Sequence, residues 1–209
     1  DKVSKDRRQQ KLTDIFRVPS QSNPSDTVGI QNEIRSNLMK AGKICFVPET
    51  FVNLAQAKEL IIELGGIPCY PVLADGSKKR CEYETPVEQL IETLKANHYT
   101  MVELITIRNS PEVLIEYVSA IRQAGIAVVA GTEHNTLNLL PIKPACVGGE
   151  AVPEEIDSIF KEGICVLAAH AFLTAHGEEG FVDGQEGDAN QRIEGFSRIG
   201  AVVLKNYFG

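Results

Sequence analysis

The sequence predicts an α/β fold in which parallel strands alternate with helices. Three short apolar segments, at residues 67–73, 101–107 and 126–131, are separated by stretches in which apolar residues recur at helical spacing. The segments are continuously apolar rather than alternating, which is typical of strands covered on both faces of a parallel sheet. Because strand–helix–strand units of this length are right-handed, we expect three adjacent parallel strands in chain order, with helices between them.

The helices between these strands are expected to begin at capping residues. Asn53 is a candidate N-cap for a helix through residue 64, and Ser110 followed by Pro111 opens the helix before the last strand. Thr85 and Glu88 have the spacing of a capping box around Pro86. The helix after Asn53 is expected to pack on the core through Leu54, Ala57, Leu60, Ile61 and Leu64.

We expect three parts in this chain of 209 residues. Residues 1–42 form an N-terminal polar and helical segment with a linker, residues 43–136 form the α/β part, and residues 137–209 form a helical C-terminal extension. In the extension, Asp188 caps a last helix with core side chains Ile193, Phe196, Ile199, Val203 and Tyr207. A complete eight-fold barrel requires about 250 residues. The α/β part is therefore expected to be the later part of a barrel or a small open sheet.

Composition argues against several classes of protein. The formal net charge of −7 makes a general nucleic-acid binder unlikely by its electrostatics. The five cysteines contain no CxxC pair, which argues against a zinc ribbon and a disulfide framework and favours a reducing cytoplasm. No uninterrupted apolar run approaches the roughly 20 residues of a membrane span, so no membrane partner is expected.

Polar and ionisable residues gather where the predicted strands end. The last strand runs into Thr132, Glu133, His134 and Asn135, the middle strand contains Glu103 and ends at Arg108 and Asn109, and the first contains Tyr70. The carboxyl ends of parallel strands lie side by side, so these side chains are expected to converge. A polar loop with a helix cap is the alternative interpretation of residues 132–135.

The residue types at these strand ends favour a metal and a phosphate. A carboxylate inside an apolar strand, as at Glu103, costs several kcal/mol unless it is paired or bound to metal. Carboxylate and imidazole ligands suit Zn, Mn or Fe, which makes Glu133, His134 and Glu103 the candidate metal ligands. Arg108 suits a phosphate group. Glu133, His134 and Arg108 are the candidate catalytic residues, and the candidate substrate-binding residues are Arg108, Asn109, Asn135 and Tyr70.

Three segments resemble the PHP (polymerase and histidinol phosphatase) superfamily. The segment LGGIPCYP at residues 64–71 resembles its helix–strand "AHP" motif. MVELI at residues 101–105, followed by NSPE at 109–112, resembles the next strand and helix, and AGIAVVAGTEH at 124–134 resembles the final "GSDxH" strand. The order and spacing agree, and the match covers roughly residues 51–136.

The resemblance implies a distorted, TIM-like (β/α) barrel with divalent metal ions that hydrolyses a small phosphorylated substrate. The aspartate of the final motif falls on Glu133, and its histidine falls on Asn135, or on His134 with a shift of one residue. The histidine of "AHP" falls on Tyr70, which cannot replace imidazole as a neutral ligand, and the early HxH motif is absent. These departures leave two alternatives open. One is a catalytically degenerate barrel that binds a ligand or partner, and the other is an unrelated α/β enzyme using Glu133 and His134 for acid–base chemistry without metal.

The edges of a three-stranded or four-stranded sheet lead to a further expectation. Strands of buried type cannot stay bare in water, so they must be covered or paired. We therefore expect the chain to self-associate or to belong to a longer polypeptide with upstream strands, and by itself to show little phosphatase activity.

Overall fold

The computed structural model describes residues 2–48, 50–74, 80–132, 134, 141–183 and 187–209, apart from the side chain of residue 3. The chain divides into two compact units. The first comprises Asp1–Val52 and His134–Leu139, and the second comprises Asn53–Glu133 and Leu140–Gly209. The second unit thus holds both the predicted α/β part and the C-terminal helices, whereas the boundaries expected from the sequence, after residues 42 and 136, stay predictions.

The first unit contains two helices joined by a short loop. Helix α1 covers Lys2–Phe16, helix α2 covers Thr27–Ile34, and a π-helical turn, η1, continues α2 over Arg35–Met39. Asp26 caps α2 by accepting a hydrogen bond from the Gly29 backbone amide at 2.9 Å. The Glu33 carboxylate accepts a hydrogen bond from the Ser20 hydroxyl at 2.7 Å and so fixes the loop to α2.

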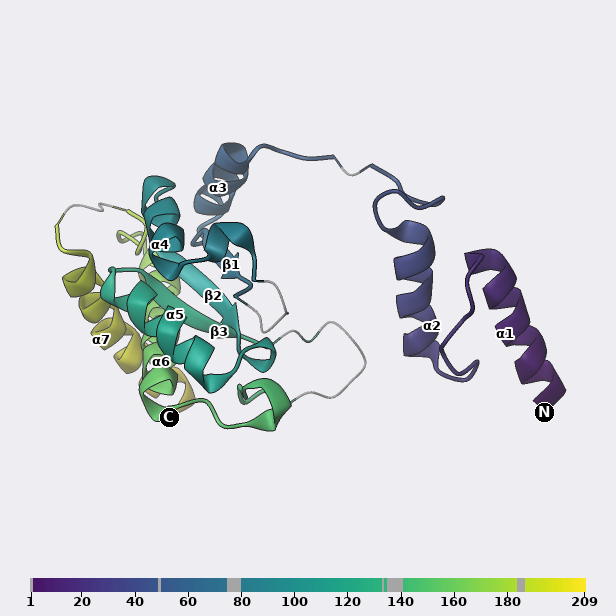
Figure 1. Cartoon of the computed structure of the whole chain (residues 1–209). Helices are drawn as coiled ribbons and strands as arrows, with labels where there is room; N and C mark the ends of the chain where they lie inside the picture. Colours follow the sequence, from purple (N-terminus) through teal and green to yellow (C-terminus); the bar gives the residue numbers. More distant parts are fainter. Residues whose placement is uncertain (1, 49, 75–79, 133, 135–140, 184–186) are drawn as a thin grey trace. The chain divides into compact units, whose positions relative to one another are not determined.

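The sheet of the second unit confirms the predicted strand arrangement. Strands β1 (Cys69–Val72), β2 (Met101–Ile105) and β3 (Ala127–Gly131) are parallel and lie in the order β1-β2-β3 (Figure 1). The register pairs Cys69 with Met101 and Met101 with Ala127. Helix α4 (Val87–Ala96) connects β1 to β2, and helix α5 (Pro111–Gln123) connects β2 to β3. The α/β class and the parallel units are therefore established, and the described strands form an open sheet.

Helices α4 and α5 cover one face of this sheet. Leu90 and Leu94 of α4 and Leu114 of α5 are buried against Val102 and Leu104 of β2. The side chains of β2 alternate between the two faces, as in any strand. On the opposite face, Met101 and Ala127 pack with residues of the two C-terminal helices, whereas Glu103 and Val129, in the middle of their strands, are only half-buried.

The C-terminal helices pack closely through glycines. Helix α6 (Glu154–Ala175) crosses β3 at Gly163, where an added Cβ would lie 2.1 Å from the Val128 carbonyl oxygen. Helix α7 (Ala189–Phe208) crosses α6 at Gly200, where a Cβ would lie 1.7 Å from the Cys165 carbonyl oxygen. By length and composition α6 is apolar enough to cross a membrane. In the structure α6 packs on β3 and on α7.

The caps of three helices follow the sequence prediction, and one does not. Asn53 forms a capping box with Gln56 at the start of helix α3 (Leu54–Glu63), and Ser110 and Asp188 cap α5 and α7. The capping box predicted around Pro86 is wrong, because Pro86 itself is the N-cap of α4 and no side chain caps that helix. Short 3-10 turns η2 (Glu82–Glu84), η3 (Thr106–Arg108) and η4 (Val147–Gly149) complete the described elements.

One predicted apolar stripe is largely exposed, and another is buried only in part. On α3, Leu54, Leu60, Ile61 and Leu64 are all exposed. On α7, Ile193 is buried and Phe196 is partly buried, but Ile199 and Tyr207 are exposed. The stripes have helical periodicity, but periodicity alone does not determine whether another element lies against them.

Candidate functional site

Glu103 lies on the face of the sheet opposite to α4 and α5, and its carboxylate is directed to the carboxyl end of β3. A Cβ added to Gly131 would lie 2.1 Å from Glu103 Oε1, so the carboxylate occupies the space above this glycine. In the register Glu103 itself is paired with Val129, two residues earlier in β3. The side chain therefore reaches along the sheet toward the strand ends, where ligands collect in parallel α/β folds.

The Glu103 carboxylate has no hydrogen bond or ion pair with any described residue. Glu103 is only half-buried, and the apolar Ile105 Cδ1 also lies close to Gly131, 2.5 Å from a Cβ added there. A carboxylate in such surroundings loses part of its hydration without gaining a partner.

Cys69 lies on the same face, nearer the amino end of the sheet. Burial, and after it the negative charge of Glu103, raises the pKa of the Cys69 thiol to about 12. The thiol is therefore protonated at neutral pH, although the residue keeps an exposed surface. Cys69 is opposite Met101 in the register, two residues before Glu103 on β2.

Tyr70 faces the opposite side of the sheet from Glu103, and the structure does not bring the two together. Its ring packs against the core formed with α4 and α5, and its hydroxyl donates a hydrogen bond to Glu84 Oε1 at 3.3 Å. Burial, followed by the charge of Glu84, raises the pKa of Tyr70 to about 12. The side chain that stands where the resemblance expects a histidine is thus held in place on the helix-covered face.

Glu84 is a buried carboxylate that sequence reasoning missed. It accepts hydrogen bonds from the backbone amides of Leu73 at 3.1 Å and Ala74 at 2.8 Å, directly after β1. Its carbonyl oxygen accepts a hydrogen bond from the Tyr117 hydroxyl at 2.7 Å. In the sequence Glu84 ends a polar loop, and nothing in that pattern distinguishes it from exposed acids such as Glu82. Only the chain's return to the end of β1 buries it.

Arg108 and Asn109 follow β2, and they have different surroundings. Arg108 is exposed in η3, at the strand-end side of the sheet. Asn109 is fully buried, and its side-chain amide donates a hydrogen bond to the Ile105 carbonyl oxygen at 2.9 Å. Its Oδ1 has no hydrogen-bond partner in the described part of the chain. Asn109 therefore supports the turn after β2, and its predicted contact with a substrate stays a prediction.

The remaining predicted residues follow β3. Glu133 and Asn135 lie outside the described residues. His134 is described and exposed, and it is grouped with the first unit. Among the residues that the structure describes, no three His, Cys, Asp or Glu side chains are close enough together to hold a metal ion. Glu103 is thus the predicted ligand whose position in the sheet is known.

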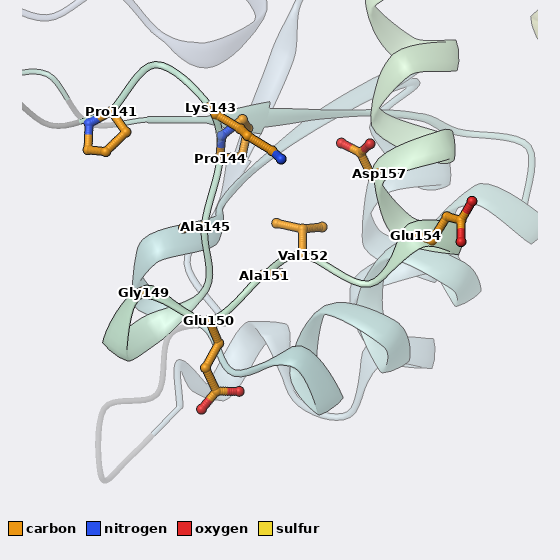
Figure 2. Close-up of a pocket in the computed structure, with 10 residues that line it drawn as sticks. All are labelled: Pro141, Lys143, Pro144, Ala145, Gly149, Glu150, Ala151, Val152, Glu154 and Asp157. Carbon is orange, nitrogen blue, oxygen red and sulfur yellow. The ribbon is translucent and has the colours of Figure 1, made fainter.

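A cavity of about 430 Å³ lies in the segment that leads from β3 into α6. Its walls include Pro141, Lys143, Glu150, Glu154 and Asp157 (Figure 2). Figure 2 shows the Lys143 ammonium and the Asp157 carboxylate directed toward one another across the cavity, with Val152 beside them. Asp157 also forms an ion pair with Lys161 at 2.7 Å. This cavity has the charged groups and the apolar walls typical of a site for a small polar ligand.

A second, much smaller cavity shares part of its lining with the first and also touches residues that follow β2 and β3. It measures about 30 Å³, and it is lined by Thr106 and Ile107 after β2, by Thr132 after β3, and by residues that also line the larger cavity. Both cavities belong to the second unit. Sequence reasoning missed Lys143 because it stands in an irregular loop without a recognisable motif.

Comparison with known proteins adds no relative: no protein-family model, curated protein or solved structure matches the chain.

Proposed function

We propose that the chain provides part of a metal-dependent hydrolase site of the PHP type, a phosphoesterase in which Glu103 is one of the metal ligands. The single observation that carries the proposal is the position of the Glu103 carboxylate. It lies over Gly131 at the carboxyl end of the sheet without a hydrogen bond or ion pair to any described residue. A metal ion would compensate this charge, which no described side chain does.

The chemistry of the residues fits such an ion in part. A carboxylate oxygen is a suitable ligand for Mn, Zn or Fe, and a bound ion supplies an activated water for attack on phosphorus. Glu103 alone is not a complete ligand set, so we propose Glu133, two residues after Gly131 in the sequence, as a further ligand. The roles predicted for His134 as a ligand and for Asn135 as a substrate contact stay predictions. Arg108, exposed beyond β2, binds the phosphate in this proposal.

Metal binding by the full chain tests the proposal directly. After removal of metal by a chelator, the wild type should bind Mn²⁺, and Glu103→Gln should bind it at least tenfold more weakly. Removal of a group that only supports a metal ligand weakens metal binding by about 10- to 100-fold, so tenfold is the smallest loss expected when a ligand itself is removed. Glu92→Gln is the matched control, because Glu92 is an exposed acid on α4. Slow hydrolysis of a phosphomonoester that requires Mn²⁺ and is lost in Glu103→Gln supports the hydrolase. Equal Mn²⁺ binding by the wild type and Glu103→Gln would contradict it.

The larger cavity favours a second candidate function, a module that binds a small ligand without catalysis. Lys143 supplies a cation at the cavity wall, and the Tyr70 hydroxyl is engaged in a hydrogen bond to the Glu84 carboxylate. For this function, inorganic phosphate or a sugar phosphate should raise the melting temperature. Lys143→Gln should remove this stabilisation. Lys95→Gln, which replaces an exposed lysine on α4, should keep it. No stabilisation by either probe would contradict this second function.

A further inference from the structure

Helices α6 and α7, which pack against each other, leave an apolar groove between them. The groove has a volume of about 290 Å³, and its lining residues are Phe172, Ile199, Val202, Val203, Asn206 and Tyr207. Its aliphatic wall on α7 is open to water, since Ile199 is 41% and Val202 is 60% exposed. On α6, Ile164 and Leu167 are exposed as well. We call the groove and these two residues the α6–α7 face; a contiguous apolar surface of this kind marks an interaction site.

The α6–α7 face is large enough for a stable interface. The helices have 22 and 20 residues, which corresponds to a length of about 30 Å. Two helices side by side, each about 10 Å wide, cover roughly 600 Å², close to the roughly 800 Å² that each partner buries in a standard interface. The close crossing of Gly200 with the Cys165 carbonyl oxygen holds the two helices together, so the face is formed before a partner binds.

The charges beside the groove have both signs. Glu194 and Arg198 of α7 form an ion pair at 3.5 Å, while the Lys205 ammonium has no ion pair with any residue that the structure describes. The exposed acids Glu178 and Glu179 follow the end of α6. Helices that lie on a membrane surface carry mainly Lys and Arg on their polar side. The mixture of charges therefore favours a protein partner over a lipid surface.

The positions of Glu194 and Lys205 make the face complementary to itself. They are eleven residues apart, about three helical turns, so they lie on the same side of α7. Ile199 and Gly200 are midway between them. When two copies of α7 pack antiparallel across a two-fold axis at this midpoint, Glu194 of each copy lies opposite Lys205 of the other. A second copy of the chain therefore supplies matching apolar contacts and two ion pairs.

The edges of the sheet are less suitable for a second copy. In β1, Pro71 has no N–H to donate, and directly after the strand the Leu73 amide already donates to Glu84 at 3.1 Å. At β3, helix α6 lies against the strand backbone, with Gly163 next to the Val128 carbonyl oxygen. These features oppose the addition of a strand, whereas the α6–α7 face has no such obstacle.

We propose that the α6–α7 face is the interface of a two-fold symmetric homodimer, in which α7 of each copy packs antiparallel against α7 of the other. The self-association expected from the sheet edges is thereby assigned to the helices. The four helices of the dimer form a bundle whose apolar side chains bury one another. The inference does not depend on the proposed hydrolase, because it uses α6 and α7 alone.

The mass of the full chain in solution tests the proposal. Sedimentation equilibrium should give twice the chain mass of 22.9 kDa. Val202→Asp should raise the dissociation constant of the dimer at least about a hundredfold, because both copies would bury an unpaired carboxylate. Val202 is exposed within the subunit, so circular dichroism should show that the variant still folds. Ile115→Asp, at an exposed aliphatic residue of α5, is the matched control and should leave the dissociation constant unchanged.

Charge reversal tests the antiparallel arrangement. Glu194→Lys and Lys205→Glu should each weaken the dimer about tenfold, because each reverses a charge in two symmetry-related pairs. Combined in one chain, the two substitutions should restore most of the affinity, because opposite charges again face each other across the two-fold axis. Independent effects within one subunit would instead add.

Each outcome decides the proposal. A dimer that Val202→Asp dissociates and that the combined charge reversal restores supports it. A chain that stays at 22.9 kDa at the highest concentration measured overturns the homodimer. A dimer that Val202→Asp leaves unchanged overturns the assignment to the α6–α7 face, and charge reversals whose losses add overturn the antiparallel arrangement. A monomer that binds anionic lipid vesicles, and loses this binding in Val202→Asp, overturns the homodimer in favour of a membrane surface.

Discussion

Replacing the buried acid Glu84 should reveal how much the return of the chain to β1 contributes to stability. Glu84→Ala leaves the backbone amides of Leu73 and Ala74 without their acceptor. An unsatisfied buried donor costs about 1–3 kcal/mol. If one of the two amides can still bind water, the free energy of unfolding should fall by about 3 kcal/mol in total. Glu84→Gln keeps one acceptor oxygen, and the Tyr70 hydroxyl can turn to accept from the new amide. It loses only the charge assistance, about 1 kcal/mol.

Urea unfolding followed by circular dichroism measures both variants. The midpoint should fall in the order wild type, Glu84→Gln, Glu84→Ala, with an unchanged slope that indicates the same surface exposed on unfolding. Glu92→Ala is the control, because Glu92 is an exposed acid on the neighbouring helix α4. If Glu84→Ala differs from the wild type by less than about 0.5 kcal/mol, which is the usual range of surface substitutions, the argument from the three hydrogen bonds is refuted.

Three more predictions follow from the same structure. Gly200→Ala should lower the free energy of unfolding by at least the roughly 1–3 kcal/mol typical of overpacking, since the new methyl meets the Cys165 carbonyl oxygen and not a flexible side chain; an unchanged thermal midpoint would contradict this close crossing. The pKa of Tyr70 is raised to about 12 in the folded chain, so between about pH 10 and pH 12 the folded state keeps a proton that the unfolded state loses. The contribution of Tyr70 to the free energy of unfolding is therefore complete below about pH 10 and is lost as the pH rises toward 12. Alkaline unfolding of Tyr70→Phe should depend less on pH over this window than that of the wild type, and identical curves would contradict the prediction. The pKa of the Cys69 thiol is raised to about 12 by burial and by Glu103, so iodoacetamide at pH 8 should modify Cys69 more slowly than Cys45, although both residues have exposed surface. Peptide mass spectrometry can measure the two rates, and the reverse order would contradict the raised pKa of Cys69.

Local patterns in the sequence were sufficient for the elements of the α/β unit. Asn53, Ser110 and Asp188 begin helices where the sequence predicts, because an N-cap depends on a side chain and the amides two or three residues later. The three apolar segments are parallel strands in chain order, because a helix of this length between two strands leaves few other topologies. Where one local rule competed with another, at Pro86, the prediction of a capping box was wrong.

The sequence by itself therefore determined the strands, the helices and the order in which the strands pair. Tertiary structure alone decided which side chains share a face and what covers it. Tyr70 and Glu103 both follow from the pattern as strand residues, but the register places them on opposite faces, so they cannot act together. Glu84 acquires its role only from atoms distant in the sequence, the amides at the end of β1. Secondary structure depends on neighbours along the chain, whereas the surroundings of a side chain depend on contacts that no local pattern encodes.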